Sequence, residues 1–493
     1  MSPLSRFILL LALLLAAPVQ AQESADDQAR RLLEDGLSYW KQGKLKQAFD
    51  NFNIIITSFP RTESVGQALL EIGRYRMEVG GDSEAARAAF EQVAREHARN
   101  DAAPGAYYWL GLLTFRRATQ PAELEDALAQ FGRVETLYPR SDWVPLAMQA
   151  SARVHRRAGR HAEAAALNRR VALEYPTSPA APQAQFETGL AHALLGEPRV
   201  AMEEFQQVRN RFPESSWAAS ALDKTTALYR LHGGARPTFG LDRTFATATG
   251  NVLKDVRSLL VDPEGYLWIA SEKVKSAVRV SPSGQVEASL TADEPRALTL
   301  TPGGEVALAA KTALRAGPRD IRSFSLPPGK PGDKPEPLER ILAATVIPGG
   351  DVLVSDEKER KVLRFDSQGG FLGTFPPRDT SERKVIRIVV DGEGAILLLD
   401  RDERTVRVCN DAGRTLRTVG PVGLRKPLDI AVDAFRNLYV ADEENGVVVF
   451  APSGQPFFTI GGSDVGKAAA LALDQTGAIL VYDDGEDRVL RYR

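Results

Sequence analysis

Two internal repeats of different period limit the folds open to this chain more than any other feature of its sequence. In the N-terminal half an aromatic–proline pair recurs as Phe59-Pro60, Tyr138-Pro139, Tyr175-Pro176 and Phe212-Pro213. The last three prolines are 37 residues apart, and the first gap of 79 has room for two units, with Glu96-His97 where the middle pair would fall. A fixed period of this length is typical of stacked units that share one continuous core.

Each N-terminal unit carries small residues and an aromatic residue at fixed distances before its proline. Two units show the pattern at equal offsets: Gly36, Ala48, Phe52 and Pro60 in the first, and Gly189, Ala201, Phe205 and Pro213 in the fifth. Glycine and alanine let two antiparallel helices approach closely, and the aromatic residue four positions after alanine lies on the same helical face. Because proline stops the second helix, the pattern predicts helix pairs, followed by a capping helix over 216–231.

The C-terminal half repeats at about 42 residues. The residues that begin the turn before each apolar strand are Asp262, Thr301, Ile347, Asp391, Asp433 and Asp474. Strand–turn–strand units with evenly spaced turns predict radial stacking into a propeller of six blades. The chain ends at Arg493, directly after the third strand of the last unit, so the upstream segment 240–246 is predicted to supply the missing outer strand and close the ring.

These residues carry two family resemblances. The helical units resemble the tetratricopeptide repeat, whose Trp-Leu-Gly-Tyr-Ala-Phe-Ala-Pro pattern has the same order, and their Phe/Tyr-Pro-x-Ser/Thr endings look like the subtype found in exported envelope proteins of Gram-negative bacteria. The strand units, with VDxxGxLYVAD followed by VxxFxxxG, resemble the NHL repeat, a six-bladed β-propeller family. The predicted fold class is therefore multidomain α + β: an N-terminal α-solenoid of tetratricopeptide repeats followed by a six-bladed all-β propeller.

The N-terminus predicts export. Arg6 supplies a positive charge, Phe7–Ala17 is a short apolar run, and Val19-Gln20-Ala21 places small residues where a signal peptidase cleaves. No cysteine follows the run, so we expect no lipid anchor, and no later segment approaches the length of a membrane span. We expect a mature protein in the periplasm or secreted, and assign the segments in order: signal peptide 1–21, mature N-terminal tail 22–27, solenoid of about five units plus capping helix 28–231, linker 232–237 and propeller 238–493.

Charge and cysteine content exclude several classes of protein. Lys and Arg number 62 against 64 Asp and Glu, so no basic surplus is present to bind nucleic acid. Cys409 is the single cysteine, which rules out an intramolecular disulfide and a thiolate metal cluster. We expect Cys409 to be a small interior or edge residue.

The propeller lacks the residues that usual active sites need. All five histidines (His97, His155, His161, His192 and His232) precede it, so it has no imidazole base and no zinc ligand set of the usual kind. A calcium site would need only oxygen ligands, such as Asp and Asn, but Asn251, Asn410, Asn437 and Asn445 share no repeat position that suggests convergence on the axis. We therefore expect no catalytic residue, no metal and no cofactor.

Four aspartates recur nine residues after a turn begins: Asp356, Asp400, Asp442 and Asp483. A short acceptor at the end of a strand can bond to backbone N–H groups and fix the turn, and its recurrence in several blades favours this interpretation over a metal ligand.

The expected function is a non-enzymatic protein-binding scaffold that organises a multiprotein complex at the bacterial cell envelope. Its partners would be proteins or peptides, not nucleic acid, with peripheral association with an outer-membrane complex and no transmembrane anchor. Alternatives are a ligand-sensing or glycan-binding propeller and, less favoured, a metal-dependent lyase or lactonase.

Helical-repeat proteins line their groove with the first helix of each unit, which names Tyr39, Arg76, Thr114 and His192 as candidate partner-binding residues. The basic stretch 153–161 is expected to be a solvated helix end, with an anionic-partner surface as the alternative; on that alternative Arg153 and Arg157 join the candidates.

Overall fold

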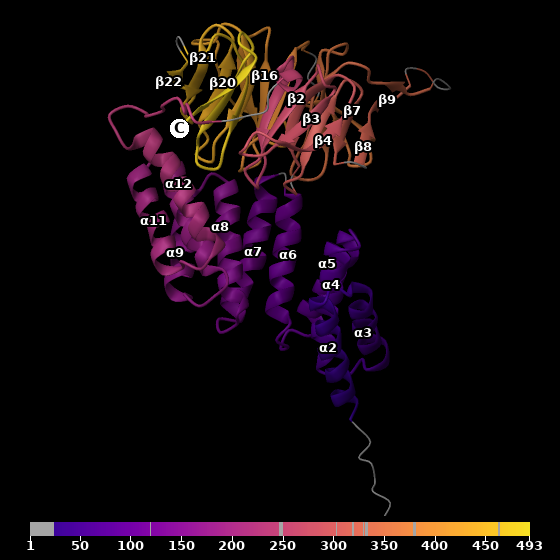
Figure 1. Ribbon diagram of the computed structural model, residues 1–493. Helices are drawn as coiled ribbons and strands as arrows, with labels where there is room; N and C mark the ends of the chain where they lie inside the picture. Colours follow the sequence, from indigo (N-terminus) through magenta and orange to yellow (C-terminus); the bar gives the residue numbers. More distant parts are fainter. Residues whose placement is uncertain are drawn as a thin grey trace, which may run out of the picture. The chain divides into compact units, whose positions relative to one another are not determined.

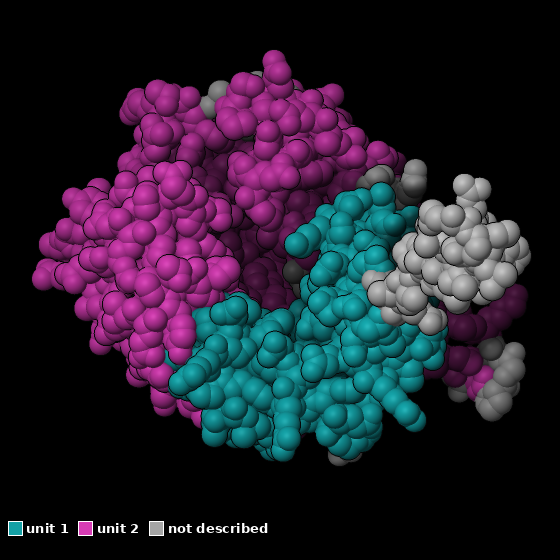
Figure 2. Space-filling model, turned by 90° about the horizontal axis from the view of Figure 1, so that it is seen from below, with its two compact units in different colours: residues 1–115, 122–150 teal, residues 116–121, 151–493 magenta. Residues whose placement is uncertain are grey.

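The computed structural model describes residues 24–118, 120–245, 250–301, 303–317, 320–328, 330, 334–377, 381–461 and 464–493. The predicted signal peptide lies outside these residues. Within them, eleven α-helices precede the strands of a six-bladed β-propeller (Figure 1). The chain divides into two compact units, residues 1–115 with 122–150 and residues 116–121 with 151–493 (Figure 2). The last helices thus belong to the same unit as the propeller, although the sequence placed a domain boundary after them.

The first unit consists of helix pairs. Its helices are α2 (Ala25–Lys41), α3 (Leu45–Ser58), α4 (Ser64–Glu78), α5 (Ser83–Glu96), most of α6 (Ala103–Arg117), most of α7 (Pro121–Leu137) and the start of α8 (Trp143–Arg157). Helix α2 begins inside the segment that the sequence assigned to a tail. The reason is a helix cap: Ser24 Oγ accepts a hydrogen bond from Asp27 N at 3.1 Å and satisfies a free N–H of the first turn.

Glycine lets the two helices of each pair touch. A Cβ atom on Gly36 would lie 2.5 Å from Phe52 Cε1, and one on Gly111 would lie 2.6 Å from Phe131 Cε1. Gly189 faces Phe205 in the same way in the fifth unit, where a Cβ would lie 2.8 Å from the ring. The spacing found in the sequence therefore reflects direct packing of helix backbone against an aromatic ring.

The second unit contains the remaining helices and all strands. The helices are α9 (His161–Glu174), α10 (Ala181–Leu194), α11 (Pro198–Arg211), α12 (Ser216–His232) and the 3-10 helix η1 (Gly250–Leu253). The first three blades are β1 (Val256–Val261), β2 (Leu267–Ser271), β3 (Ser276–Val280) and β4 (Val286–Thr291); β5 (Pro295–Leu300), β6 (Val306–Ala310), β7 (Ala313–Ala316) and β8 (Asp320–Ser323); and β11 (Ile341–Val346), β12 (Val352–Asp356), β13 (Lys361–Phe365) and β14 (Phe371–Phe375). A two-stranded hairpin, β9 (Ser325–Leu326) with β10 (Glu336–Pro337), lies between the second and third blades in the sequence.

The last three blades follow the same antiparallel order. They are β15 (Val385–Val390), β16 (Ile396–Asp400), β17 (Thr405–Cys409) and β18 (Thr415–Val419); β19 (Pro427–Val432), β20 (Leu438–Asp442), β21 (Gly446–Phe450) and β22 (Pro456–Ile460); and β23 (Ala468–Leu473), β24 (Ile479–Asp483) and β25 (Arg488–Tyr492). The first strand of each blade contacts that of the next, and β23 contacts β1, so the six blades form a closed ring.

The last blade obtains its outer strand from upstream of the first. Gly240 N donates to Arg493 O at 3.0 Å, Arg493 N donates to Gly240 O at 3.0 Å, and Asp242 N donates to Arg491 O at 2.8 Å. The sequence placed a closing strand here over residues 240–246. In the structure the pairing covers residues 240–242, and residue 246 lies outside the described part.

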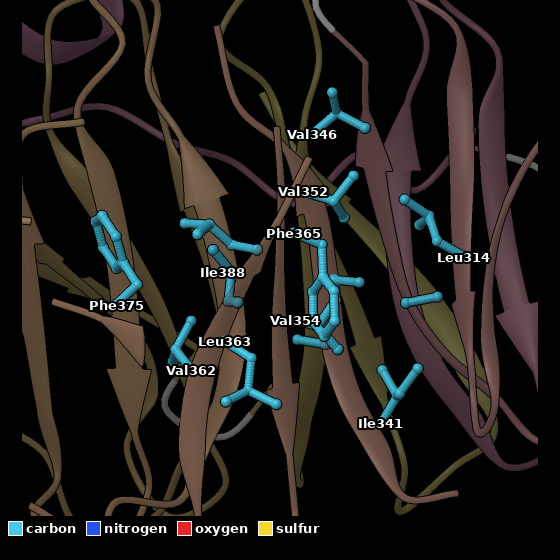
Figure 3. Packing of buried hydrophobic residues seen from close by; sticks show 14 of the residues in the cluster. Leu314, Ile341, Val346, Val352, Val354, Val362, Leu363, Phe365, Phe375 and Ile388 are labelled. Carbon is cyan, nitrogen blue, oxygen red and sulfur yellow. The ribbon is translucent and has the colours of Figure 1, made fainter. Parts of the chain in front are cut away.

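The propeller core lies between the blades. The second strands β2, β12, β16, β20 and β24 are buried at every residue, which explains their continuous apolar sequences. Figure 3 shows Phe365 and Val354 of the third blade among Leu314 of the second and Ile388 of the fourth. Cys409 is buried in this cluster, so it is an interior residue as predicted.

Candidate functional site

The recurring aspartates at strand ends fix the turns. Asp442 is fully buried, and its carboxylate accepts four backbone hydrogen bonds: from Arg425 N at 2.7 Å, Lys426 N at 2.8 Å, Glu444 N at 3.1 Å and Asn445 N at 3.0 Å. In the fourth blade Asp400 accepts from the N–H groups of Asp402 at 3.0 Å and Glu403 at 3.1 Å. These bonds confirm the interpretation of the aspartates as turn acceptors.

An ion pair joins the inner strands of two neighbouring blades of the propeller. Arg387 extends from the inner strand of the fourth blade, and its Nε donates to Asp429 Oδ1 of the fifth blade at 2.8 Å. Its Nη2 donates to the carbonyl oxygen of Arg257 in the first blade, which stands opposite the fourth in a ring of six. Asp429 Oδ2 accepts from Leu471 N of the sixth blade at 3.1 Å. Arg387 and Asp429 thus connect the inner strands of the fourth, fifth, sixth and first blades.

Burial and a neighbouring charge act in opposite directions on the pKa of Asp429. Burial raises the pKa of Asp429, and the nearby Arg387 guanidinium acts in the opposite direction. Since the guanidinium donates to backbone and carboxylate acceptors, the pair is held by charge-assisted hydrogen bonds inside the ring. In the part of the chain that the structure describes, no group of three or more His, Cys, Asp or Glu residues is placed to hold a metal ion.

The first helices of the repeats share a second candidate surface, which we call the inner-helix face and define by Trp40, Arg74 and Trp109. The Arg74 guanidinium of α4 lies 5.1 Å from the ring centre of Trp40 in α2 and 5.6 Å from that of Trp109 in α6. These are cation–π distances. Arg74 Nη1 also pairs with Glu71 at 2.7 Å, and burial raises the pKa of this carboxyl.

The groove residues named from the sequence lie elsewhere. Arg76 Nη1 donates to Ala85 O of the paired helix at 3.4 Å, and Thr114 Oγ1 donates to Leu110 O of its own helix at 3.0 Å. His192 lies 2.6 Å from Glu197, and the Tyr39 ring faces Lys44.

The four groove candidates named from the sequence occupy the same repeat position. Each lies three residues after the glycine of its own unit. Residues three apart lie on the same side of a helix, and the glycine faces the second helix of its pair, so this position lies beside that helix and its turn. His192 also lies 3.2 Å from Arg169 of α9 in the preceding unit. The structure therefore moves the candidate surface to residues on either side of this position.

The basic stretch is not a solvated helix end. In the second unit Arg156 Nε pairs with Glu393 in the turn between β15 and β16 at 3.0 Å, and Arg157 Nη2 pairs with Asp411 in the turn between β17 and β18 at 3.0 Å. Arg153 lies 3.6 Å from Glu187 of α10. The expectation of a solvated face was wrong because these guanidinium groups find partners within the chain.

Helix α12 reaches the neighbouring blades by similar contacts. Arg230 Nη1 donates to Thr476 O at 2.6 Å, and Lys224 Nζ donates to Gln475 O at 3.4 Å. Leu228 and Leu231 pack with Phe435, which lies in the turn between β19 and β20. Sequence reasoning missed this interface, although the short predicted linker limited the orientations of the two parts.

Comparison with known proteins supports the repeat assignment. A family model of the tetratricopeptide repeat matches residues 67–99 and 183–215. No curated protein matches the chain. Among solved structures, virginiamycin B lyase from Staphylococcus aureus is 15% identical, with a TM-score of 0.39 over 52% of this chain and 85% of that one. The WD40 β-propeller domain of Doa1 is 13% identical, with a TM-score of 0.38 over 48% of this chain and 78% of that one.

Among the described residues, no helix combines the length and the apolar character needed to cross a bilayer.

Proposed function

We propose that this protein is an exported, non-enzymatic scaffold that binds other proteins and organises a multiprotein complex at the bacterial cell envelope. Tetratricopeptide repeats joined to a propeller support protein binding, since both folds offer large preformed surfaces and little ordering cost. The NHL-like blade sequences and the signal-like N-terminus support the assignment to an exported propeller protein. A periplasmic location belongs to the same proposal.

The inner-helix face is the observation that carries this function. The Arg74 side chain is 26% exposed, and Trp40 and Trp109 are half-buried, so a partner can reach this face. An extended peptide that supplies carbonyl or carboxylate acceptors would bond to the exposed part of the guanidinium. The indoles of Trp40 and Trp109 would pack against its side chains, as aromatic and arginine residues do at the centres of interfaces.

The alternative of a propeller that binds a small ligand or a glycan in its channel has less support. Arg387 and Asp429 occupy the channel and bond to inner strands on several sides of the ring. A ligand there would have to displace a buried ion pair, which leaves charges without partners at a cost of about 3–5 kcal/mol.

The test is affinity capture from a periplasmic extract with a matched pair of double variants. Glu71→Gln with Arg74→Met removes the ion pair of the inner-helix face without leaving a buried charge. Arg95→Met with Glu96→Gln removes an exposed pair on α5, whose arginine side chain is 73% exposed. We expect the first variant to lose a protein that the wild type and the control retain. Recovery of no specific protein by the wild type, or equal recovery by both variants, would contradict the proposal.

A thermal-shift series separates the enzymatic and ligand-sensing alternatives. Ca²⁺, Zn²⁺, EDTA and cell-wall fragments are added to the purified mature protein. A scaffold is expected to show no large metal- or glycan-dependent shift, and a stabilisation of several degrees by either ligand would favour the other class of function.

A further inference from the structure

Helix α12 occupies the position of a first helix in a sixth helical unit. It follows an aromatic–proline pair, as α8 and α10 do. In the part of the chain that the structure describes, no second helix follows it, because the chain runs directly into the propeller. Thr238 N donates to Arg230 O at 2.8 Å, and Gly240 then pairs with Arg493. The side of α12 that would face a second helix therefore has no cover from its own unit.

The uncovered side of α12 carries four uncharged residues, which we call the capping-helix stripe: Ala219, Leu222, Thr226 and Tyr229. Their spacing places them on one side of the helix. Leu222 is 44% exposed, and Tyr229 is 66% exposed. Thr226 Oγ1 donates to Leu222 O at 2.9 Å, so its hydroxyl group is already satisfied within the helix. The stripe thus presents apolar surface to solvent, although the end of a helical array is usually polar.

The same positions are covered in the earlier units. Leu222 corresponds to Leu69, Met148 and Gln185, each of which is at most 5% exposed. Tyr229 corresponds to the four groove candidates named from the sequence, all of which are half-buried. In these units the second helix lies against this side of the first helix, in most of them with an aromatic ring on the glycine. The stripe continues this repeated interface, which indicates that another helix fits it.

Thr226 limits what that helix can carry. It stands where four earlier units have glycine, and a Cβ atom at this position fills the space in which their phenylalanine rings lie. The fourth unit shows the alternative, since Ala152 replaces the glycine and Asn168 replaces the phenylalanine, and both are buried. A helix on the stripe should therefore place a short side chain against Thr226 and apolar side chains against Leu222 and Tyr229.

A second copy of α12 suits the stripe less well than a helix of another protein. The stripe is about 15 Å long, which is about three turns of helix. Two copies would each contribute only Leu222 and Tyr229 as large side chains, whereas specific, stable interfaces bury about 1,200 Å² or more in total. A partner that also binds the scaffold elsewhere does not need that area at this one contact, because its second contact is intramolecular.

We propose that the capping-helix stripe binds an amphipathic helix of a partner protein, which takes the place of the missing second helix of the sixth unit. The apolar face of this helix packs on Leu222 and Tyr229, and a short side chain lies against Thr226. The proposal rests on the proposed scaffold function. It names the kind of partner segment that the scaffold holds, at a surface separate from the inner-helix face.

The experiment selects binders from a phage-displayed library of helical peptides of about 18 residues, a length at which a helix can form, with one face randomised. The immobilised target is the full-length mature protein. Enriched peptides are synthesised with a fluorophore, and their affinities are measured by fluorescence polarisation. Leu222→Lys and Tyr229→Lys test the stripe, and Thr226→Gly tests the requirement for a short side chain. Leu173→Lys is the matched control, because Leu173 is a leucine of α9 that is 60% exposed.

We expect enriched peptides to be apolar along one helical face, with Gly, Ala, Ser or Asn at its centre. Leu222→Lys and Tyr229→Lys should each weaken binding by about tenfold or more, whereas Leu173→Lys should leave it within about twofold. A second selection on Thr226→Gly should enrich an aromatic residue at the central position.

Four results would overturn the proposal: no enriched peptide, enriched sequences without a helical period, equal binding to all variants, or an aromatic central residue on the wild type. Concentration-dependent dimers that Leu222→Lys abolishes would also overturn it and assign the stripe to a second copy of the chain. The Glu71→Gln, Arg74→Met variant should bind the selected peptides normally, so this proposal and the scaffold proposal can fail separately.

Discussion

Replacement of Asp442 by alanine tests the interpretation of the strand-end aspartates quantitatively. The buried carboxylate accepts four backbone hydrogen bonds, so the alanine variant leaves four N–H groups without their partner. At about 1 kcal/mol for each lost bond, we expect the free energy of unfolding to fall by about 4 kcal/mol. Asp400 accepts two such bonds, so Asp400→Ala is expected to cost about 2 kcal/mol.

The measurement is differential scanning calorimetry of the full chain, with urea denaturation followed by circular dichroism as a second estimate. A loss of 1 kcal/mol lowers Tm by about 2–4 °C in a domain of this size, so the two variants should be separated by about 4–8 °C. Equal losses for Asp442→Ala and Asp400→Ala would refute the bond-counting argument. Stabilisation of the wild type by Ca²⁺ that disappears in Asp442→Ala would instead identify this aspartate as a metal ligand.

Three further predictions follow from packing, charge and burial. In urea denaturation Gly189→Ala should cost about 1–3 kcal/mol, because its Cβ would lie 2.8 Å from an aromatic ring, whereas Gly132→Ala, which has open space on a helix, should gain up to about 1 kcal/mol. Burial lowers the pKa of His161 and His232 below 6.5, so the unfolded state binds more protons below that value, and stability should fall as the pH drops from about 7 to 5. Replacement of both histidines by Gln should flatten this slope when urea midpoints are compared across that range. Arg387→Met should lower stability by about 3–5 kcal/mol in calorimetry, because a buried carboxylate loses its partner.

The sequence predicted the features that depend on local spacing. The pair of Gly36 and Phe52 recurs in later units because each unit must pack its own two helices. The aspartate at position 391 recurs because each turn must satisfy its own N–H groups. Asp391 Oδ1 accepts from Glu393 N at 2.9 Å and from Ala395 N at 2.8 Å. Such constraints act within one unit, so they are visible as repetition along the chain.

Contacts between distant residues were not predictable in this way. Arg156 and Glu393 are 237 positions apart, and each resembles an ordinary surface charge in the sequence. The pair in the channel did leave a signal, since Arg387 interrupts the apolar strand VIRIVV and Asp429 interrupts PLDIAV. Charges inside packed strands need partners, but Arg257 and Arg296 interrupt other inner strands in the same way, so the sequence did not show which arginine pairs with Asp429.

The same repeat position serves two different purposes along the helical array. Arg74 in α4 and Arg153 in α8 each follow directly after the small residue of their unit. Arg74 lies between two indoles and pairs within its own helix, whereas Arg153 lies 3.6 Å from Glu187 of the next unit's first helix. Charges neutralised between neighbouring units hold those units together and leave fewer groups for a partner. If the proposed scaffold function holds, partner specificity should therefore reside in the early units, where Trp40 and Trp109 flank Arg74 in place of an ion pair between units.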